Sequence, residues 1–591
     1  MKLSDYIIDF LVNEGVTHIF ELTGGAITHI LDSASRREDI QCVSVHHEQA
    51  GAFAAEGYAR MNSNLGVAMA TSGPGALNMV TGIGSCYFDS VPCLFITGQV
   101  NTYEYKFDKP IRQLGFQETD IVNIVKPISK YAELIIDADK IRYCLEKAVF
   151  IARNGRPGPV LLDIPMNVQR AQIEPKKLAS FFDSNEYKSF QVQNDWSDTE
   201  IDQVIDQVIE SITQAERPLI LAGGGIRTAQ ATQEVNEFIE KTNIPVVTSL
   251  MGLDVIAHDN PCFYGMIGSY GNRYSNLTMA NCDLLLILGS RLDTRQTGAR
   301  IDTFARVAKK IHVDIDPTEL NSKISVNQAV RCDIKQFLKK INIKLDSIDK
   351  PKISEWYGVI QTYKSNYNDH SNCIETNNID PNLFIEKLSS LTTEGDIICL
   401  DVGQNQMWAA QSFAIKKNQR MLTSGGMGAM GFSLPASIGA LKASPGNNAI
   451  VLTGDGGIQI NIQELETIKN LNLSTKIFTL NNRCLGMITQ FQELYFEGRL
   501  QSSVIGYSCP DFTKLADAYG IPAFTLTTLN DADALIKKVL SMNGPVLVDV
   551  QLEQKTVVNP KLEFNRPIED MLPLLDRDEL KRIMLIDLLD E

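Results

Sequence analysis

The stretch GDGGIQINIQELETIKNLNLSTKIFTLNN, residues 454–482, decides the fold of this chain. It directly follows the apolar run AIVLT, and it closes on a second apolar run, TKIFTL, that has the length of a strand. The residues between the two runs have the periodicity of a helix. A strand, a helix and a second strand in this order predict a βαβ unit, whose parallel strands end at the same edge of a sheet. Asp455 and Asn482, which lie 27 positions apart, are therefore expected to meet at one ligand-binding edge.

The residue types at this edge predict a site for a metal ion and a phosphate group. Gly454, Gly456 and Gly457 would let the backbone approach a phosphate closely. The carboxylate of Asp455 and the amide oxygen of Asn482 are hard ligands of the kind that Mg²⁺ prefers. The helix that starts at the turn adds N–H donors for an anion. A Gly-Asp-Gly turn alone is common, but the turn, the spacing and the paired Asn together indicate a Mg²⁺–diphosphate site.

Short apolar runs alternate with helix-period segments along most of the chain. The strand-length runs are 67–72, 92–98, 159–165, 218–224, 244–249, 283–289, 310–316, 396–401, 449–456, 475–482 and 545–550. This alternation predicts an α/β protein with doubly wound parallel sheets. Polar segments at 166–198 and 343–380 have the composition of linkers. We therefore expect three α/β domains, at 1–175, 190–345 and 375–555, and a Pro-containing charged tail at 556–591.

The composition is ordinary for a soluble globular protein. The formal net charge of −16 disfavours a phosphate backbone as a partner. The N-terminus lacks the pattern of a secretory signal, and no apolar run is long enough to cross a membrane. The 11 cysteines form no CxxC pairs, which favours reduced thiols and a cytoplasmic location.

Residues 454–482 resemble the thiamine-diphosphate signature of the decarboxylase and carboligase superfamily. The resemblance implies that Asp455, Asn482 and the backbone carbonyl of Cys484 bind Mg²⁺. In this superfamily a glutamate hydrogen-bonds the cofactor's aminopyrimidine, which then acts as an internal base. Glu48, in VSVHHEQAGAFAAEGYAR (43–60), occupies the matching place between a strand and a helix, where its carboxyl is expected to be shielded. The alternative is that Glu48 only favours the start of its own helix.

Over residues 1 to about 555 the chain is similar to the acetohydroxyacid (acetolactate) synthase catalytic subunit. The matching segments include ELTGGA (21–26), TSGPGALN (71–78), GFQETDIV (115–122), GRPGPVLLDIP (155–165), GSRLDTRQTG (289–298) and HVDIDP (312–317). The resemblance implies that Gly25 and Ala26 line the site, and that Phe116 and Gln117 flank the substrate. It implies thiamine-diphosphate contacts at Gly403, Gln404, Asn405, Gly428, Met430, Gly454, Gly456, Gly457 and Met487. Asn405 replaces a family His, and we expect its amide to donate to a phosphate oxygen instead.

The family's middle domain carries FAD, so the resemblance extends to a third cofactor. The GGG triplet at 223–225 follows an apolar run and precedes a helical pattern, which suits a phosphate-binding turn as well as a plain tight turn. The FAD contacts that the resemblance implies are Arg156, Gly223, Gly224, Gly225, Gly268, Gly289, Arg291, Arg295, Asp314 and Asp333. Because the ligation is redox-free, the flavin would have a structural role.

Three departures from the family fall in the acceptor pocket. Met166 stands where the family usually has Lys, Thr294 where it has Asp, and Phe491 where it has Trp, while Arg295 remains. The tail at 561–580 resembles that of a flavin-containing thiamine group that adds an acetyl unit to keto-sugars. These departures leave two interpretations of the acceptor open, a changed acceptor and drift within true synthases.

The sequence therefore predicts decarboxylation of a 2-oxo acid such as pyruvate and carboligation of the acyl carbanion to a second carbonyl compound. The alternative is acetyl transfer to a ketone such as a nucleotide-linked keto-sugar. A flavin oxidase of the pyruvate oxidase kind and an inactive scaffold are further alternatives, disfavoured by the matching segments and by intact Glu48, Asp455 and Asn482. In the family the pyrimidine-binding and diphosphate-binding domains of different subunits face each other. The resemblance thus implies a homodimer or homotetramer with active sites at the interface, with or without a regulatory subunit.

Overall fold

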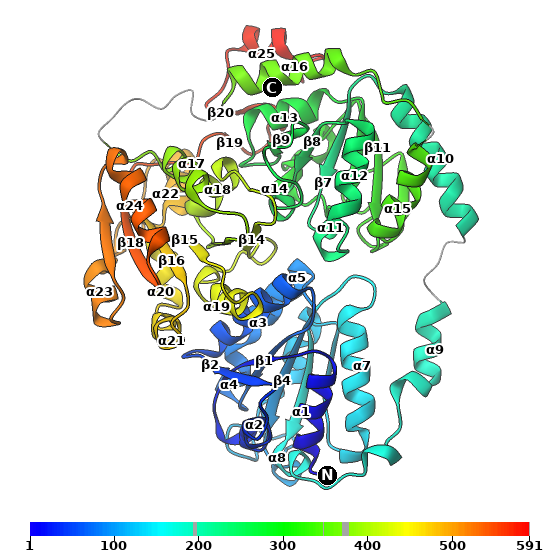
Figure 1. Ribbon diagram of the computed structural model, residues 1–591, viewed down its shortest axis with the longest axis vertical. Helices are drawn as coiled ribbons and strands as arrows, with labels where there is room; N and C mark the ends of the chain where they lie inside the picture. The colour runs from blue at the N-terminus through cyan, green and yellow to red at the C-terminus, as the bar shows by residue number, and fades with distance from the viewer. Residues whose placement is uncertain (193–197, 347, 369–377, 590–591) are drawn as a thin grey trace.

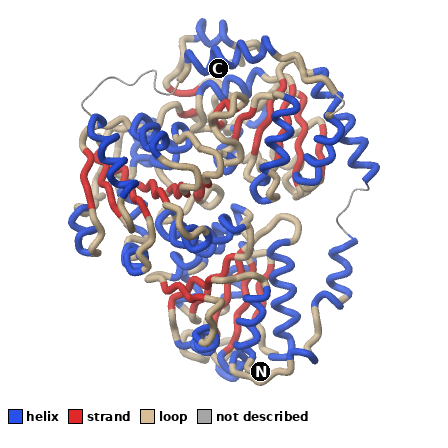
Figure 2. Tube along the Cα trace, viewed as in Figure 1, coloured by secondary structure: helices blue, strands red, loops and turns tan. Residues whose placement is uncertain are grey.

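The computed structural model describes residues 1–192, 198–346, 348–368 and 378–589. Within these residues the chain forms three six-stranded parallel sheets and one two-stranded antiparallel sheet. Helices cover the faces of each large sheet (Figures 1 and 2). All eleven apolar runs named above form strands of these sheets, so the α/β class with doubly wound parallel sheets is confirmed.

The first sheet has the strand order β2-β1-β3-β4-β6-β5. Its strands are β1 (His18–Leu22), β2 (Gln41–Ser44), β3 (Gly66–Ala70), β4 (Cys93–Gln99), β5 (Tyr131–Leu134) and β6 (Val160–Pro165). Its helices are α1 (Leu3–Asn13), α2 (Thr28–Ser35), α3 (Glu48–Asn62), α4 (Pro74–Asn78), α5 (Val80–Asp89), α6 (Ile121–Val125), α7 (Ile141–Arg153), α8 (Met166–Gln169) and α9 (Asn185–Val192). Below, these elements are called the N-terminal block.

The second sheet, in the central block, has the order β12-β11-β10-β7-β8-β9. Its strands are β7 (Pro218–Ala222), β8 (Val246–Thr248), β9 (Phe263–Met266), β10 (Leu284–Leu288), β11 (Lys309–Asp314) and β12 (Gln328–Arg331). Its helices are α10 (Asp198–Gln214), α11 (Gly225–Thr228), α12 (Thr232–Thr242), α13 (Arg273–Asn281), α14 (Thr294–Thr297), α15 (Ile334–Leu345) and α16 (Ser354–Asn366).

The third sheet, in the C-terminal block, has the order β14-β13-β15-β16-β18-β17. Its strands are β13 (Ile397–Leu400), β14 (Arg420–Thr423), β15 (Ala449–Gly454), β16 (Thr475–Asn481), β17 (Ala523–Leu526) and β18 (Val546–Gln551). Its helices are α17 (Pro381–Leu391), α18 (Gln404–Ser412), α19 (Ser433–Ala443), α20 (Asp455–Ile460), α21 (Glu464–Asn470), α22 (Gly486–Tyr495), α23 (Phe512–Ala518) and α24 (Ala532–Ser541). The tail adds β19 (Lys561–Leu562), β20 (Met571–Leu572) and α25 (Arg577–Ile583).

The connection between β15 and β16 differs from the single helix that the sequence predicts. It consists of two short helices, α20 and α21, which are separated at residues 461–463. Asn461 sits at the break, and its side-chain amide donates to the carbonyl of Gly431 at 2.9 Å and to Oε1 of Gln49 at 3.1 Å. The break follows from these contacts with other parts of the chain, which local periodicity does not encode.

The polar segment 343–380 contains a packed helix and is not simply a linker. Trp356, Ile360 and Tyr363 of α16 are buried at helical spacing, and the indole N–H of Trp356 donates to the carbonyl of Pro218 at 3.1 Å. The tail closes the same cluster, because the hydroxyl of Tyr363 donates to the carbonyl of Ile583 at 2.6 Å. Figure 1 shows α25 beside α16, over the central block. Residues 369–377 of the predicted linker lie outside the described residues.

The segment 166–198 is also partly folded. It contains α8, two short 3₁₀ turns and α9. Phe181 is fully buried and its ring packs edge-on against Tyr143 of α7, with 5.5 Å between centroids. Residues 193–197 of this predicted linker lie outside the described residues. In the part of the chain that the structure describes, no helix is both long and apolar enough to cross a bilayer.

Helices α3 and α19 join the N-terminal block to the C-terminal block. A Cβ atom added at Gly57 would lie 2.3 Å from the carbonyl oxygen of Ala436, and one added at Gly439 would lie 1.8 Å from that of Ala54. The two helices therefore touch backbone to backbone, which only glycine permits at these positions. The rings of Phe53 and Phe432 meet edge-on beside this contact, with centroids 5.4 Å apart.

Replacing Gly57 by Ala is expected to destabilise the protein by about 1–3 kcal/mol, because the added methyl group overpacks the α3–α19 contact. Gly358→Ala is the matched control, since Gly358 lies inside α16 and a Cβ there meets nothing within 4 Å. That control is expected to gain about 0.5–1 kcal/mol from helix propensity. Denaturant unfolding followed by circular dichroism measures both changes. Equal stability of the Gly57 variant and the parent would refute the close packing.

Candidate active site

The predicted site residues near the N-terminus gather around the loop 71–75. A Cβ atom added at Gly24 would lie 2.4 Å from Cβ of Thr71, and the backbone N–H of Ala26 donates to the Thr71 hydroxyl at 3.2 Å. Gly25, between them, faces open space, because a Cβ added there meets nothing within 4 Å. Thr71 thus contacts the turn that carries Gly25 and Ala26 on one side, and the space beside Gly25 is open.

The same loop approaches the predicted activating carboxylate. A Cβ atom added at Gly75 would lie 3.1 Å from Oε1 of Glu48, and one added at Gly73 would lie 2.9 Å from the carbonyl oxygen of Gln117. Gly73 has a φ of +66°, so a side chain there would be strained as well. Because the loop has glycine at positions 73 and 75, Gln117 and Glu48 can approach its backbone closely.

Glu48 is buried at the first turn of α3, with 8 % of its surface exposed. Its carboxylate accepts a hydrogen bond of 2.9 Å from the side-chain amide of Asn78. The acceptor that caps α3 is the ring of His47, which receives the N–H of Gln49 at 3.2 Å. Helix capping at this turn is thus provided by His47, and the Glu48 carboxylate points to a different partner.

The residues that flank Glu48 bind the C-terminal block of the same chain. The backbone N–H of His46 donates to Oε1 of Glu464 at 3.0 Å, and Oε1 of Gln49 accepts from Asn461 at 3.1 Å. The contact within one chain therefore uses His46 and Gln49, whereas Glu48 faces α4.

Phe116 and Gln117 lie in a loop that a buried carboxylate organises. Glu118 is 6 % exposed and accepts the backbone N–H groups of Lys106 at 2.8 Å and Leu114 at 2.6 Å. Gln117 is half-buried and has a φ of +64°. Phe116 is 85 % exposed, so a large apolar ring stands in solvent at the tip of this loop.

The edge of the third sheet that is predicted to bind the metal has the expected strand geometry. Strands β15 and β16 are parallel, with Gly454 aligned with Leu480, so Asp455 and Asn482 follow neighbouring strand ends. Asp455 is 2 % exposed and accepts a hydrogen bond of 2.9 Å from the hydroxyl of Tyr507. Burial raises the pKa of Asp455 to about 6, which a bound cation would oppose.

The amide of Asn482 is oriented by a second predicted residue. Its Nδ2 donates to Oε1 of Gln404 at 2.8 Å, which leaves Oδ1, the atom that could bind a metal, outside this bond. Glycine at position 486 leaves room for this pair, because a Cβ there would lie 1.8 Å from the same Gln404 oxygen. Cys484 is buried two positions beyond Asn482.

A cavity of about 420 Å³ opens at this edge, lined by Asn481, Asn482, Arg483, Gln551, Leu552 and Gln554.

Asp401 connects the predicted diphosphate segments, although the sequence interpretation missed it. It is 1 % exposed, and its carboxylate accepts the backbone N–H groups of Gly431 at 2.8 Å and Ser433 at 3.1 Å. A Cβ added at Gly457 would lie 2.6 Å from its Oδ1. Asp401 thus positions the segment after Met430 against the turn at 454–457. The signal for it was its place as the last residue of the run 396–401, directly after β13.

Asn405 holds two backbone segments beside the predicted diphosphate site. It is buried, and its Nδ2 donates to the backbone carbonyls of Asp401 at 2.8 Å and Leu452 at 3.2 Å. Its oxygen, not its amide hydrogens, faces the turns, lying 2.5 Å from a Cβ added at Gly403 and 3.3 Å from one added at Gly454. The amide of Asn405 is thus directed to backbone carbonyls in this structure, and its donation to a phosphate stays a prediction.

The other predicted thiamine-diphosphate contacts lie on neighbouring elements. Cε of Met430 is 3.4 Å from a Cβ added at Gly456, so this side chain reaches the turn. Gly428 has a φ of +65° and open space around it. Met487 lies in the first turn of α22 and is partly buried against the core of the C-terminal block.

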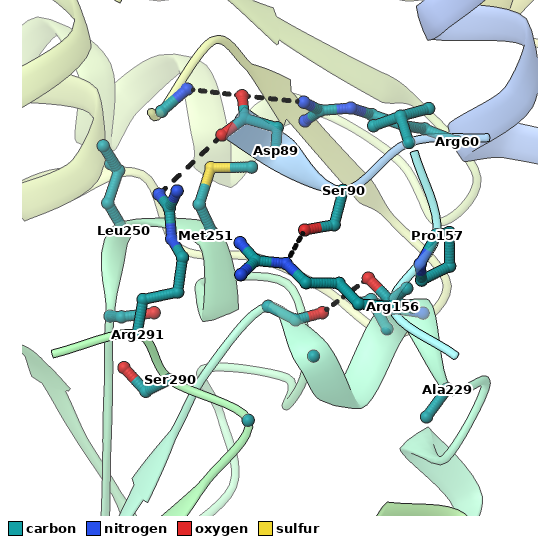
Figure 3. Close-up of a pocket in the computed structure, with 18 of the residues that line it drawn as sticks. Arg60, Asp89, Ser90, Arg156, Pro157, Ala229, Leu250, Met251, Ser290 and Arg291 are labelled. Atoms are coloured by element: carbon teal, nitrogen blue, oxygen red, sulfur yellow. Dashed lines mark hydrogen bonds and ion pairs between the residues drawn. The ribbon is translucent and has the colours of Figure 1, made fainter. Parts of the chain in front are cut away.

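A second cavity, of about 520 Å³, lies where the three blocks meet (Figure 3). Eight of the ten predicted FAD contacts line it, namely Arg156, Gly224, Gly225, Gly289, Arg291, Arg295, Asp314 and Asp333. Gly223 and Gly268 do not line it and have packing reasons to be glycine. A Cβ at Gly223 would lie 2.1 Å from the carbonyl of Gly289, and one at Gly268 would lie 2.6 Å from that of Arg295.

The charged wall of this cavity contains residues that the sequence interpretation did not single out. Asp89 accepts from Arg60 at 3.0 Å and from the backbone N–H of Gly425 at 2.8 Å, and Arg291 lies 4.0 Å away. Figure 3 shows Arg60 and Arg291 converging on Asp89. Arg156 donates to the hydroxyl of Ser90 at 2.8 Å. Asp89 therefore links all three blocks at the cavity.

The four predicted acceptor-pocket residues lie on three different elements. Met166 is the first residue of α8, Thr294 and Arg295 begin α14, and Phe491 lies in α22. Within the described residues, these four side chains make no hydrogen bond, ion pair or ring contact with one another. Phe491 instead packs on Tyr495, with ring centroids 4.9 Å apart. The four residues thus come from the N-terminal, central and C-terminal blocks.

The chain matches three families over successive parts of its length. These are described as the N-terminal TPP binding domain (residues 1–124), the central domain (205–341) and the C-terminal TPP binding domain (401–550) of thiamine pyrophosphate enzymes. It is 36 % identical to acetolactate synthase 2, chloroplastic, of Nicotiana tabacum, over 97 % of this chain and 85 % of that protein.

Algal and bacterial relatives show the same similarity over nearly their whole length. The acetolactate synthase large subunit of Cyanidium caldarium is 36 % identical, over 96 % of both chains. That of Buchnera aphidicola is 36 % identical, over 94 % of this chain and 96 % of that protein. With its three parallel sheets and the residues gathered above, the chain belongs to the acetolactate synthase family of thiamine pyrophosphate enzymes.

Proposed function

We propose that this enzyme decarboxylates pyruvate and joins the two-carbon unit to a second 2-oxo acid, as an acetolactate synthase. The observation that carries the proposal is the edge of the third sheet. There, buried Asp455 lies beside Asn482, whose amide is oriented by Gln404. The relatives named above are acetolactate synthases, so transfer to a nucleotide-linked keto-sugar is not favoured.

The residues at this edge fit Mg²⁺ and thiamine diphosphate. A carboxylate, an amide oxygen and a backbone carbonyl are oxygen donors of the kind Mg²⁺ takes, and Asp455, Asn482 and Cys484 would supply them. Gly403, Gln404, Gly428, Met430, Gly454, Gly456, Gly457 and Met487 would surround the cofactor. When bound, thiamine diphosphate supplies the electron sink for decarboxylation of a 2-oxo acid. Asn405 would act by holding the turns at Gly403 and Gly454.

Glu48 would hold and pass a proton at its carboxyl group, facing the cofactor's aminopyrimidine. Its burial and its hydrogen bond to Asn78 support this role, because they fix the carboxylate in a largely dry position. Gly25 would leave space for substrate, and Phe116 and Gln117 would close over it. These roles keep water out and orient the reactants.

FAD would occupy the cavity between the three blocks. Arginines 156 and 291 line it together with backbone turns at Gly224 and Gly289, a combination suited to a diphosphate. The carboxylate of Asp314, whose pKa burial raises to about 6, is a candidate acceptor for a ribose or ribityl hydroxyl. Because Asp89 connects all three blocks here, a ligand in this cavity would stabilise their arrangement.

The active assembly would be a homodimer or a dimer of dimers. Apolar side chains stand in solvent along the loop that carries Phe116, including Tyr103, Phe107 and Leu114. Glu48 faces away from the C-terminal block of its own chain, whereas its neighbours bind that block. A second chain would cover the exposed loop and bring its own Asp455 edge to Glu48.

We also propose a cytoplasmic location and the domain limits 1–175, 190–345 and 375–555. The described cysteines are free, and most are buried, which suits a reducing compartment. The tobacco relative, by contrast, is named as a chloroplast protein.

Product analysis tests the proposed activity. The purified enzyme is supplied with thiamine diphosphate, Mg²⁺, FAD and pyruvate, and with no other acceptor. The expected result is pyruvate loss with one acetolactate formed for every two pyruvates. Absence of acetolactate would contradict the proposal, and turnover restored by an added ketone would identify a different acceptor.

A further inference from the structure

Asp89, the last residue of α5, is a buried carboxylate in an unfavourable place on its own helix. Its side chain is 0 % exposed, and its Oδ2 accepts from Arg60 of α3 at 3.0 Å. A carboxylate in the last turn faces the negative end of the helix dipole, so the helix itself disfavours it. The partners of Asp89 outside α5 therefore have to compensate for this position.

Two of these partners are backbone N–H groups of the C-terminal block. Oδ2 of Asp89 accepts the N–H of Gly425 at 2.8 Å, and Oδ1 accepts that of Gly426 at 2.7 Å. Both glycines belong to the segment 424–430, which ends at the predicted thiamine-diphosphate contact Met430. The end of α5 therefore holds the start of this segment through two charge-assisted hydrogen bonds.

Further hydrogen bonds make the segment 424–430 a compact turn. Ser424 is fully buried, and its hydroxyl accepts the backbone N–H of Ala429 at 3.2 Å. The same hydroxyl lies 3.2 Å from that of Ser85 in α5. Because these bonds hold the turn together, a shift of its first residues is expected to move Met430, whose methyl group reaches the first turn of α20.

Arg291 connects Asp89 to the cavity proposed for FAD. Its guanidinium lies 4.0 Å from Oδ1 of Asp89 (Figure 3), and its Nη1 donates to the carbonyl of Phe88 at 2.5 Å. Arg291 lines the cavity with 25 % of its side chain exposed, so it can also contact an anion there. Arg156, which lines the cavity as well, donates to the hydroxyl of Ser90 at 2.8 Å. Two arginines of the cavity therefore contact the end of α5.

A diphosphate in this cavity would bring negative charge to these arginines. Arg291 would then lie between two anions, the ligand and the Asp89 carboxylate. We propose that Asp89 is a positioning residue that couples occupancy of the FAD cavity to binding of thiamine diphosphate, because it holds Gly425 and Gly426. This inference rests on the proposed function for the identity of both cofactors. Since such coupling is reciprocal, each cofactor tightens binding of the other by the same factor.

The test is the dissociation constant of thiamine diphosphate, measured by calorimetry at saturating Mg²⁺ on the full-length enzyme stripped of its cofactors, with and without FAD. In the parent, FAD is expected to tighten this binding about tenfold, which is a usual size for coupling between sites. In Asp89→Asn the ratio of the two constants is expected to fall to within about twofold of one, because the amide loses the charge and one acceptor oxygen. Asp139→Asn, at an exposed carboxylate of the N-terminal block, is the matched control and is expected to keep the parent ratio.

Two further measurements distinguish positioning from a general loss of structure. FAD affinity, followed by flavin fluorescence with and without thiamine diphosphate, is expected to change by the same factor as in the converse titration. Arg291→Met at saturating FAD is expected to lose the coupling, although Asp89 still accepts from both glycines. A variant that only loosens the fold would lower the melting temperature and both affinities but keep their ratio.

A second variant tests the same contact if Asp89→Asn fails to fold. A Cβ added at Gly426 would lie 2.7 Å from Cβ of Phe88, so Gly426→Ala is expected to push the segment 424–430 away from α5 and to remove the coupling. Three results would overturn the inference. These are a parent that does not bind FAD, equal thiamine-diphosphate affinity of the parent with and without FAD, or a parent-like ratio in the folded variant.

The outcomes separate this inference from the proposed activity. If the parent forms no acetolactate but the ratio depends on Asp89, the activity is wrong and the coupling stands. If the parent forms acetolactate and binds the two cofactors independently, the coupling is wrong and the activity stands.

Discussion

Glu48→Gln is expected to lower turnover by about a hundredfold or more, because glutamine cannot hold and pass a proton. The substitution keeps the size of the side chain and an oxygen that can accept the hydrogen bond from Asn78, which measures 2.9 Å in the parent. The fold and Mg²⁺ binding are therefore expected to survive. Steady-state rates of pyruvate consumption, with the metal content measured in parallel, give the comparison.

The control for this experiment is Glu38→Gln, at an exposed carboxylate of the same block. It is expected to leave the rate unchanged. Retained turnover in the Glu48 variant would remove Glu48 from its proposed role. An equal loss in the Glu38 variant would point to a general effect of charge on the block.

Asp455→Ala is expected to abolish retention of thiamine diphosphate. The alanine removes the buried carboxylate at the end of β15 and leaves the hydroxyl of Tyr507 without its acceptor. Asp455 would supply one oxygen ligand to Mg²⁺, so its loss is expected to weaken binding of the metal and, with it, of the diphosphate. Fluorescent assay of thiamine diphosphate in the purified protein measures the loss directly, whether or not the enzyme turns over.

Asp517→Ala serves as its control, because Asp517 is an exposed carboxylate on α23 of the same block. That variant is expected to copurify with as much cofactor as the parent. Asp455→Asn keeps the shape and one oxygen donor, so partial retention is expected. An Asp455→Ala protein that copurifies with full cofactor would show that the cofactor is held elsewhere.

Much of the fold could be predicted from the sequence because its signals are local. Buried parallel strands need short runs of apolar residues, and each of the eleven runs forms a strand. Segments 343–380 and 556–591 were harder to interpret. Their apolar residues are spaced among many polar ones, and Trp356 is recognisable as core only when Ile568 and Leu580 of the tail pack beside it.

The site residues also divide into those that a local sequence pattern predicts and those that depend on the tertiary structure. Asp455 and Asn482 could be placed together because the βαβ pattern aligns the ends of neighbouring strands. The contribution of Asp401 could not, because its hydrogen bonds to Gly431 and Ser433 depend on how the following segments fold back. The hydrogen bonds of the Asn405 amide could not be predicted either, since they go to two carbonyls that only the folded sheet brings near.

The sequence by itself therefore determined the α/β class, the strands and the strand-end positions of Glu48, Asp455 and Asn482, because side-chain periodicity and turn residues act over short distances along the chain. Only the tertiary structure decided which distant groups meet. It placed the loop 71–75 against Glu48, and it placed Lys561 over Phe491, 70 positions away. Such contacts are set by strand order and helix packing, which join segments that share no local pattern.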